Sequence, residues 1–168
     1  MKRLLVVLTV LLSLFAGVAI ASANSGSAII PLYAASNYAG YRYSTWVYLS
    51  NITDQDINVK VTLYKTNGTI LTDTVGEYIN GHYLSNYNDK LTDASLSFTL
   101  GPNSFGKFSI NSNEHPNTGT TAGYGIIKWE QDSKAVQGLV AHAIGYYVMT
   151  SNPVPSQLAI PINNGLPF

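Results

Sequence analysis

Three pairs of carboxylates are the residues of this sequence that come closest to a catalytic pattern. The pairs are Asp54 with Asp56, Asp89 with Asp93, and Glu130 with Asp132. Two carboxyl groups that meet at a cleft can serve as acid and base in glycoside hydrolysis. All three pairs fall in or beside predicted turns, however, where Asp side chains commonly accept hydrogen bonds from nearby backbone N–H groups. We therefore expect no catalytic residue, and a protein that is not an enzyme.

Side-chain oxygens gather in the same turns and could bind calcium, a hard cation that takes oxygen ligands. One group is Asn51, Thr53, Asp54 and Asp56, and the other is Asn86, Asn88, Asp89 and Asp93. Neither group has the spacing of the twelve-residue EF-hand loop. Ordinary hydrogen bonding within turns is the preferred interpretation. We expect no cofactor, with calcium as the one alternative.

The three histidines do not show the spacing of a zinc site. His82 and His115 lie in predicted loops, and His142 lies in a predicted strand between Ala141 and Ala143. Zinc sites commonly take two ligands that are separated by only a few residues. We therefore expect no metal ligands among the histidines, and we interpret His142 as a hydrogen-bonded residue of a sheet.

Tyrosines are frequent and could form a ligand-binding or interface surface. The sequence has 12 tyrosines and 2 tryptophans. Flat rings that carry a hydroxyl group suit sugar stacking and protein interfaces. The candidate ligand or interface residues are Tyr38, Tyr41, Tyr43, Tyr78, Tyr83 and Tyr87. The preferred interpretation is structural, because Tyr and Trp also favour strands and pair across them, and it places Trp46 and Trp129 in the core as anchors.

The charges and the missing cysteine exclude several classes of function. The 168-residue chain has nine basic and nine acidic residues, and without Lys2 and Arg3 of the leader seven basic residues remain, for a net charge near −2. A nucleic-acid partner needs a basic footprint, which is absent here. Because the sequence has no cysteine, it can form no disulfide, no thiolate metal site and no cysteine nucleophile.

The first 23 residues predict a signal peptide. Met1 to Arg3 is basic, residues 4–20 are mostly apolar, and Ala21 to Ala23 offers a small-residue cleavage site, which is the order that marks export. An uncleaved membrane anchor is the alternative, since the apolar run approaches the roughly 18 residues of a spanning helix. We expect cleavage after Ala23, no membrane span in the remainder, and a protein that is secreted, extracellular or held at the cell surface.

Residues 24–168 have the length of a single domain, and their pattern predicts strands. Apolar residues alternate from Ile57 to Lys65 with a period of two, which indicates a half-buried strand. Ser44 to Ser50 is a second strand. Thr66 to Gly68 predicts a tight turn, and a returning strand is predicted from Thr69 to Val75.

The remaining pattern also predicts strands. They are Ala28 to Tyr33, Ala94 to Leu100, Ser104 to Asn111, Gly123 to Glu130, Ala135 to Val148 and Gln157 to Asn163. About nine short strands, with almost no helical periodicity, indicate an antiparallel β-sandwich, with a closed barrel as the alternative. Gly76 to Asp93 and Ser112 to Ala122 are predicted to be long loops, which often carry function.

The first and last strands each contain a proline, Pro31 and Pro161. Proline cannot donate a ladder hydrogen bond, so these strands belong at sheet edges or are broken there. An edge strand can pair with a neighbouring molecule, so Ser27 to Tyr33 or Gln157 to Phe168 could be exchanged between subunits, with intramolecular pairing as the alternative. The candidate residues for strand exchange are Ile29, Ile30, Leu158, Ile160 and Ile162.

Three stretches resemble a group of small exported bacterial proteins of uncharacterised function. They are Tyr124 to Trp129, Gly138 to Ala143 and Ala159 to Phe168. The resemblance spans most of the chain that follows the leader. It implies an immunoglobulin-like β-sandwich and supplies no catalytic residue.

These patterns favour a non-enzymatic secreted or cell-surface module for protein–protein interaction or assembly, which self-associates through its terminal edge strands. Its partner would be another protein or a second copy of itself. The alternative is a carbohydrate-binding module that holds a glycan with exposed Tyr and Trp side chains. A row of exposed rings on one sheet face would favour the glycan, whereas buried rings and apolar terminal strands would favour assembly.

Overall fold

The computed structural model describes residues 24–38, 40–72, 79–82, 84–88, 96–111, 120–132, 137–149 and 151–168. The predicted signal peptide, residues 1–23, lies outside these ranges. Within them, no helix has the length and apolar character needed to cross a membrane. The described chain is all-β, and its one helical element is the short 3-10 turn η2, Asn163–Gly165.

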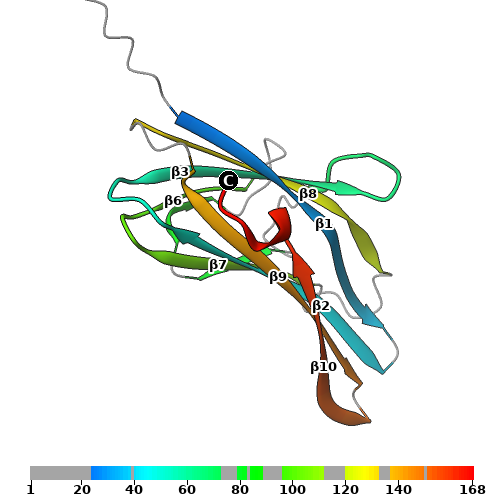
Figure 1. The fold of residues 1–168 in the computed structure, drawn as a ribbon. Helices are drawn as coiled ribbons and strands as arrows, with labels where there is room; N and C mark the ends of the chain where they lie inside the picture. Colours follow the sequence, from blue (N-terminus) through cyan, green and yellow to red (C-terminus); the bar gives the residue numbers. More distant parts are fainter. Residues whose placement is uncertain are drawn as a thin grey trace, which may run out of the picture.

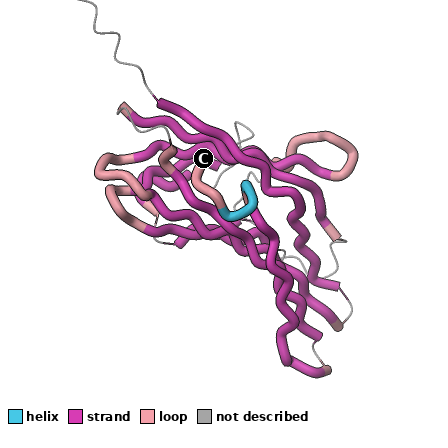
Figure 2. The backbone as a smooth tube through the Cα atoms, viewed as in Figure 1, coloured by secondary structure: helices cyan, strands magenta, loops and turns pink. Residues whose placement is uncertain are grey.

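Ten strands make up the described fold (Figure 1). In chain order they are β1 (Asn24–Tyr38), β2 (Tyr41–Asn51), β3 (Ile57–Lys65), β4 (Ile79–His82), β5 (Ser85–Asn88), β6 (Leu96–Leu100), β7 (Phe105–Ile110), β8 (Thr121–Gln131), β9 (Leu139–Met149) and β10 (Asn152–Pro161). Figure 2 shows how little of the described backbone lies outside strands. About nine strands were predicted, and the difference in position is that β4 and β5 lie in Gly76 to Asp93, which was predicted to be a loop.

The strands form one continuous antiparallel sheet that curls until its two halves face each other. The β8 half has the order β1-β8-β3-β6-β5, and the β2 half has the order β4-β7-β2-β9-β10. β1 joins the halves, because Asn24 to Ala35 pair with β8 whereas Ser36 to Tyr38 pair with β2. The curl therefore begins within a single strand.

The core lies between the inner faces of the two halves. Along β3 the buried residues are Ile57, Val59, Val61 and Leu63, as the alternation predicted. Phe98 of β6 meets Phe108 of β7 with ring centroids 6.3 Å apart, so the two halves pack through their side chains. Trp129 is buried in this core, as predicted. The prediction for Trp46 is wrong: Thr45, Val47, Leu49 and Asn51 are the buried residues of β2, and Trp46 is half-buried on its outer face.

β1 bends where it changes partner. Its register with β8 shifts between Ile30 and Tyr33, around Pro31, so the prediction that this proline interrupts its strand is confirmed. Beyond the bulge, the Thr45 hydroxyl accepts a hydrogen bond from the Ala34 N–H at 2.9 Å and donates one to the Ala34 carbonyl at 3.0 Å. The buried Thr45 side chain thus provides hydrogen-bond partners for the backbone N–H and C=O of Ala34, near the point where β1 changes its pairing from β8 to β2.

The turn after β3 forms as predicted, but the strand after it is reduced. Gly68 has a φ of 81°, and its N–H donates to the Lys65 carbonyl at 2.9 Å. Ile70 makes a single bridge to Tyr64, residues 71 and 72 are not in a strand, and residues 73–75 lie outside the described ranges. The returning strand has little edge to pair with, because β8 and β6 already occupy both sides of β3.

The segment after β10 closes the flank between the two halves (Figure 1). The Phe168 N–H donates to the Leu139 carbonyl at 2.9 Å, and the Phe168 carbonyl accepts from the Leu139 N–H at 3.1 Å. The side chains of Ile160, Ile162 and Phe168 are buried. Gly26 of β1 lies against this segment, since a Cβ atom there would sit 3.0 Å from the carbonyl carbon of Phe168.

Candidate functional site

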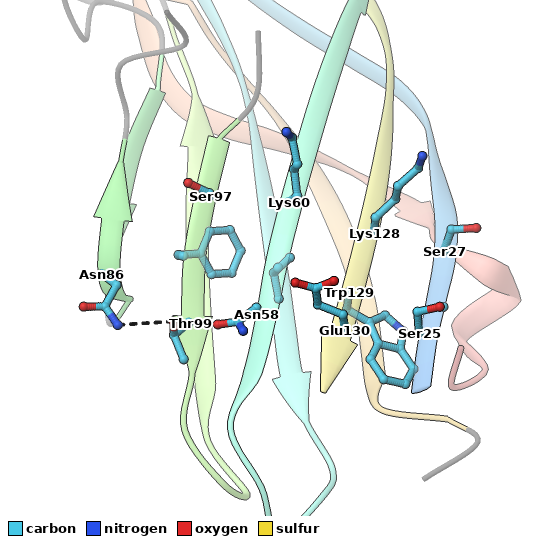
Figure 3. A pocket seen from close by; sticks show the side chains of 13 residues that line it. Ser25, Ser27, Asn58, Lys60, Asn86, Ser97, Thr99, Lys128, Trp129 and Glu130 are labelled. Carbon is cyan, nitrogen blue, oxygen red and sulfur yellow. Dashed lines mark hydrogen bonds between the residues drawn. The ribbon is translucent and has the colours of Figure 1, made fainter. Parts of the chain in front are cut away.

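A hollow lies on the outer face of the β8 half (Figure 3). Its open volume is about 850 Å³, and β1, β8, β3, β6 and β5 line it. Strand alternation explains its polar character: Asn58 and Lys60 of β3 point outward and are exposed, whereas Val59 between them is buried in the core. We call this surface the outer hollow.

Two rows of polar side chains cross the outer hollow from strand to strand. The ladder register places Ser25, Glu130, Asn58 and Thr99 in one row, which we call the amide row. It places Ser27, Lys128, Lys60 and Ser97 in the other, which we call the lysine row. Each row takes one residue from β1, β8, β3 and β6, so the rows exist only because these four strands pair in this register.

Hydrogen bonds hold one end of the amide row. The Thr99 hydroxyl donates to Asn58 Oδ1 at 3.2 Å, and Asn86 Nδ2 of β5 donates to the Thr99 hydroxyl at 3.3 Å (Figure 3). Asn86 has a φ of 51°, a left-handed conformation that Asn adopts more readily than most residues. The amide row therefore presents an arranged set of hydrogen-bond donors and acceptors.

Lys60 and Lys128 form a like-charged pair in the middle of the lysine row. They are direct partners in the ladder between β3 and β8, and both are exposed. Figure 3 shows the two side chains on the same face. Within the described part of the chain, neither makes an ion pair. Like charges placed directly opposite each other weaken a sheet, and the carboxylate of Glu130 lies on the same face, one outward position along β8 (Figure 3).

A second, acidic hollow of about 460 Å³ borders the first. It brings together Asp54, Asp56, Glu130 and Asp132, so two of the three acid pairs of the sequence share one surface. Asp89 and Asp93 lie outside the described residues. Among the described residues, no three His, Asp or Glu side chains are grouped as the ligands of a metal would be.

The first turn considered for calcium uses its side chains in hydrogen bonds of its own. Asn51 Oδ1 accepts hydrogen bonds from the Thr53 N–H at 2.9 Å and from the Thr53 hydroxyl at 2.8 Å. Asn51 Nδ2 donates to the carbonyls of Gln55 and Gly101, both at 2.7 Å. Asn51 is buried. These contacts are ordinary turn chemistry, the interpretation that the sequence favoured.

Aromatic rings stack on the outer face of the β2 half. Tyr48 of β2 stacks on His142 of β9 with centroids 4.9 Å apart and planes 6° apart. Phe105 of β7 stacks on Tyr48 at 6.0 Å and 26°. Because β7 and β9 flank β2 on opposite sides, both faces of the Tyr48 ring are covered. A sugar needs a free ring face to stack on, and the Tyr48 ring is already stacked against Phe105 and His142.

Trp46, on the same face, is also engaged. The Lys107 Nζ lies 4.3 Å from the centroid of its ring system, within the range of a cation–π interaction, and Tyr146 meets it edge-on at 6.0 Å. The hydroxyl oxygens of Tyr48 and Tyr146 are 3.4 Å apart. Burial, and then the hydrogen bond and charge of Tyr146, raise the pKa of Tyr48 to about 12.

Three of the six candidate tyrosines lie at one end of the β2 half, where β1 turns into β2. The rings of Tyr38 and Tyr41 have centroids 6.2 Å apart, and Tyr41 lies 6.0 Å from Tyr147 of β9. Tyr43 pairs with Tyr147 in the ladder. The other candidates fall outside the described residues or have side chains that do: Tyr78, Tyr83 and Tyr87. The structure thus groups Tyr38, Tyr41 and Tyr43 at a hairpin end, away from the outer hollow.

Of the five candidate residues for strand exchange, three are buried and two are exposed. Ile30, Ile160 and Ile162 are buried in this chain's own core. Ile29 is 58% exposed and Leu158 is 55% exposed. The buried residues pack within one chain, and the two exposed ones remain free to meet a partner.

Comparison with known proteins gives distant structural similarity and no family. No protein-family model and no curated protein matches the chain. The crystal structure of Thermotoga maritima 1070 aligns with 82% of this chain and 93% of that one, at 8% identity and a TM-score of 0.44. The full-length major pilin SpaD from Corynebacterium diphtheriae aligns with 82% of this chain, at 9% identity and a TM-score of 0.29.

A collagen-binding domain from a Staphylococcus aureus adhesin aligns with 77% of this chain and 96% of that domain, at 9% identity and a TM-score of 0.23. This chain spans about a third of the pilin, since the alignment covers 34% of it. Similarity at these values carries no argument about function. The resemblance to exported bacterial proteins of uncharacterised function stays a prediction.

The sequence interpretation did not single out Lys60 and Lys128. The alternation along β3 and β8 could have indicated that both lysines point outward. It could not indicate that they lie opposite each other. Their opposition depends on which residue of β8 pairs with Lys60, and the two strands are far apart in the chain. A like-charged pair across strands is visible only once the register is known.

Proposed function

We propose that this chain is an exported, non-enzymatic interaction module with an immunoglobulin-like sandwich fold, which joins a second copy of itself along the open edge of β1. The pairing of β1 is the observation that carries the proposal. Ser27 to Ile30 pair with β8 on one side, and no described strand pairs with them on the other. Gly26, nearer the start of β1, lies against the segment that follows β10. An open strand edge presents N–H and C=O groups that can accept a further strand.

The other free edges of the sheet are poorly suited to such pairing. β10 contains Pro153, Pro155 and Pro161, and each proline removes a backbone donor. β4 and β5 form the remaining edges and have four residues each, so they offer few groups for a ladder. β1 is 15 residues long and has no proline before Pro31.

A second copy of the chain suits this edge. Two β1 strands related by a two-fold axis run antiparallel, the arrangement of every ladder in the described fold and the one that a symmetric dimer requires. Ile29 lies beside the open edge and is 58% exposed. Pairing would therefore also remove apolar surface from water.

Other features support the remaining parts of the proposal. The leader pattern of residues 1–23 supports export. Packing between Phe98 and Phe108 across the core supports a sandwich in which two halves of the sheet face each other. The hydrogen bonds of Asn51 and Thr53 give the side chains of that turn a structural role, which supports a module without enzymatic chemistry.

The test compares two lysine substitutions at similarly exposed apolar positions, Ile29→Lys on β1 and Leu158→Lys on β10. Light scattering after gel filtration of residues 24–168, over a range of concentrations, measures the oligomeric state. We expect dimers of the unaltered protein and of Leu158→Lys. We expect monomers of Ile29→Lys, because two copies would bring like charges together at the joint. A monomeric unaltered protein, or equal loss of dimer in both variants, would contradict the proposal.

A further inference from the structure

We infer that the outer hollow binds an acidic glycan, a sugar chain that carries carboxylate or sulfate groups, with an oxyanion held between Lys60 and Lys128. This site goes beyond the proposed function, which uses the backbone edge of β1 and not the face of the sheet. The failure of one proposal therefore would not contradict the other.

The lysine pair supplies the charge for this site. Side chains directly opposite each other in an antiparallel ladder have Cβ atoms about 5 Å apart, so Lys60 and Lys128 project from neighbouring positions on the same face of the sheet (Figure 3). Neither has a carboxylate partner within the described ranges. An oxyanion placed between them replaces one repulsion by two charge-assisted hydrogen bonds.

The surroundings of the pair suit sugar hydroxyls. Ser27 and Ser97 continue the lysine row on either side, and each hydroxyl can both donate and accept. The neighbouring amide row adds Asn58 and Thr99, already positioned by their hydrogen bond, together with the carboxylate of Glu130 as an acceptor. A polyhydroxylated ligand needs donors and acceptors side by side, and the two rows provide both.

The size of the hollow favours a chain over a single small anion. Four adjacent strands spaced about 4.8 Å apart make each row roughly 14 Å long. The open volume of about 850 Å³ exceeds what one phosphate or acetate ion fills. An extended acidic sugar chain can place one anionic group at the lysine pair and its hydroxyl groups along the rows.

Charge distribution argues against a nucleic acid as the ligand. The acidic hollow with Asp54, Asp56 and Asp132 adjoins the outer hollow and shares Glu130 with it. A polyanion with a charge at every step would be repelled there. A sugar chain with widely spaced acidic groups would meet the lysines without crowding the carboxylates.

The test measures binding of the purified protein, residues 24–168, to immobilised polymers at low and moderate salt. The probes are sparsely carboxymethylated dextran for carboxylates, sparsely sulfated dextran for sulfates, unmodified dextran as the neutral sugar and polyglutamate as an acidic peptide. We expect binding to one of the two acidic dextrans that weakens with salt, and none to unmodified dextran. The acidic polymer that binds identifies the anionic group. No binding to either, or equal binding to polyglutamate, would overturn the inference.

Matched variants locate the site. Lys60→Gln and Lys128→Gln each remove one charge from the outer hollow, and Arg42→Gln removes one from an exposed position of β2. We expect each lysine variant to bind about fivefold more weakly or worse, and Arg42→Gln to bind within about twofold of the unaltered protein. An equal loss in all three variants would mean attraction by net charge and would overturn the site.

Thermal unfolding separates a binding role from a structural one. Removing one lysine relieves the repulsion between β3 and β8, so the midpoint of Lys60→Gln and Lys128→Gln should stay the same or rise while binding falls. Should both variants unfold earlier, Lys60→Arg decides, because it keeps the charge. Retained binding by Lys60→Arg supports the site, and lost binding overturns it.

Discussion

The hydroxyl group of Tyr33 is a buried polar group that affects the stability of this fold. The Tyr33 side chain is fully buried, and its hydroxyl has no hydrogen-bond partner among the described residues. Burial raises the pKa of Tyr33 to about 12, because the charged phenolate is disfavoured away from water. A buried hydroxyl that lacks a partner costs about 1–3 kcal/mol, so the residue is tolerated here in spite of its polar end.

We predict that Tyr33→Phe raises the free energy of unfolding by about 1 kcal/mol at pH 7. The unaltered protein should also lose stability as the pH rises above 10, because Tyr33 deprotonates in the unfolded chain near pH 10 but in the folded chain only near 12. By pH 12 this residue accounts for a loss of about 2 kcal/mol. Urea unfolding at pH 7 and at pH 11 measures both effects.

The control for this prediction is Tyr124→Phe, which changes an exposed ring of β8. That variant should keep both the stability at pH 7 and the alkaline loss of the unaltered protein. A Tyr33→Phe variant that loses as much stability above pH 10 as the unaltered protein would contradict the assignment.

At the scale of elements, two turns share one local pattern in different surroundings. Asn67 Oδ1 accepts hydrogen bonds from the Thr69 N–H at 3.1 Å and the Thr69 hydroxyl at 2.7 Å, just as Asn51 does with Thr53. Asn67 is exposed, whereas Asn51 is buried and also donates to carbonyls of other segments. The same Asn-x-Thr spacing thus forms a turn on the surface after β3 and a turn after β2 whose Asn side chain also hydrogen-bonds to other segments.

We predict that Asn51→Ala lowers the free energy of unfolding by about 2–3 kcal/mol, because it leaves buried carbonyls without donors. Asn67→Ala, the matched control, should cost less than about 1 kcal/mol, since water replaces its contacts. Urea unfolding of the two variants measures the difference. Equal losses would show that the local turn, and not the buried carbonyls, provides the stability.

Strand prediction succeeded where the pattern is local. β3 follows its alternation from end to end, and β2, β6, β7, β8 and β9 overlap the ranges predicted for them. β4 and β5 were missed because Ile79 to His82 and Ser85 to Asn88 show no such pattern. These short strands exist because β7 and β6 offer edges to pair with, and that information is not contained in the segments themselves.

At the scale of the whole molecule, closure depends on the last described residues. Phe168 pairs with Leu139 and covers the flank beside Gly26. We predict that Phe168→Ala lowers the free energy of unfolding by about 2 kcal/mol, because a buried ring is lost. Leu166→Ala, at a position that is 61% exposed, should change it by less than about 0.5 kcal/mol. Thermal or urea unfolding measures both, and equal losses would contradict a closing role for Phe168.

The sequence by itself determined the all-β character and, along β3, the inward and outward positions, because alternation is a property of neighbouring residues. It also indicated the turn chemistry of Asn51 and the interruption of β1 at Pro31. Only the tertiary structure decided that Lys60 is opposite Lys128, that no described strand pairs with the second side of β1 at Ile29, and that Tyr48 stacks between rings of β7 and β9. Each of these depends on pairing between strands that are distant in the chain, and register is set by the packing of the whole sheet.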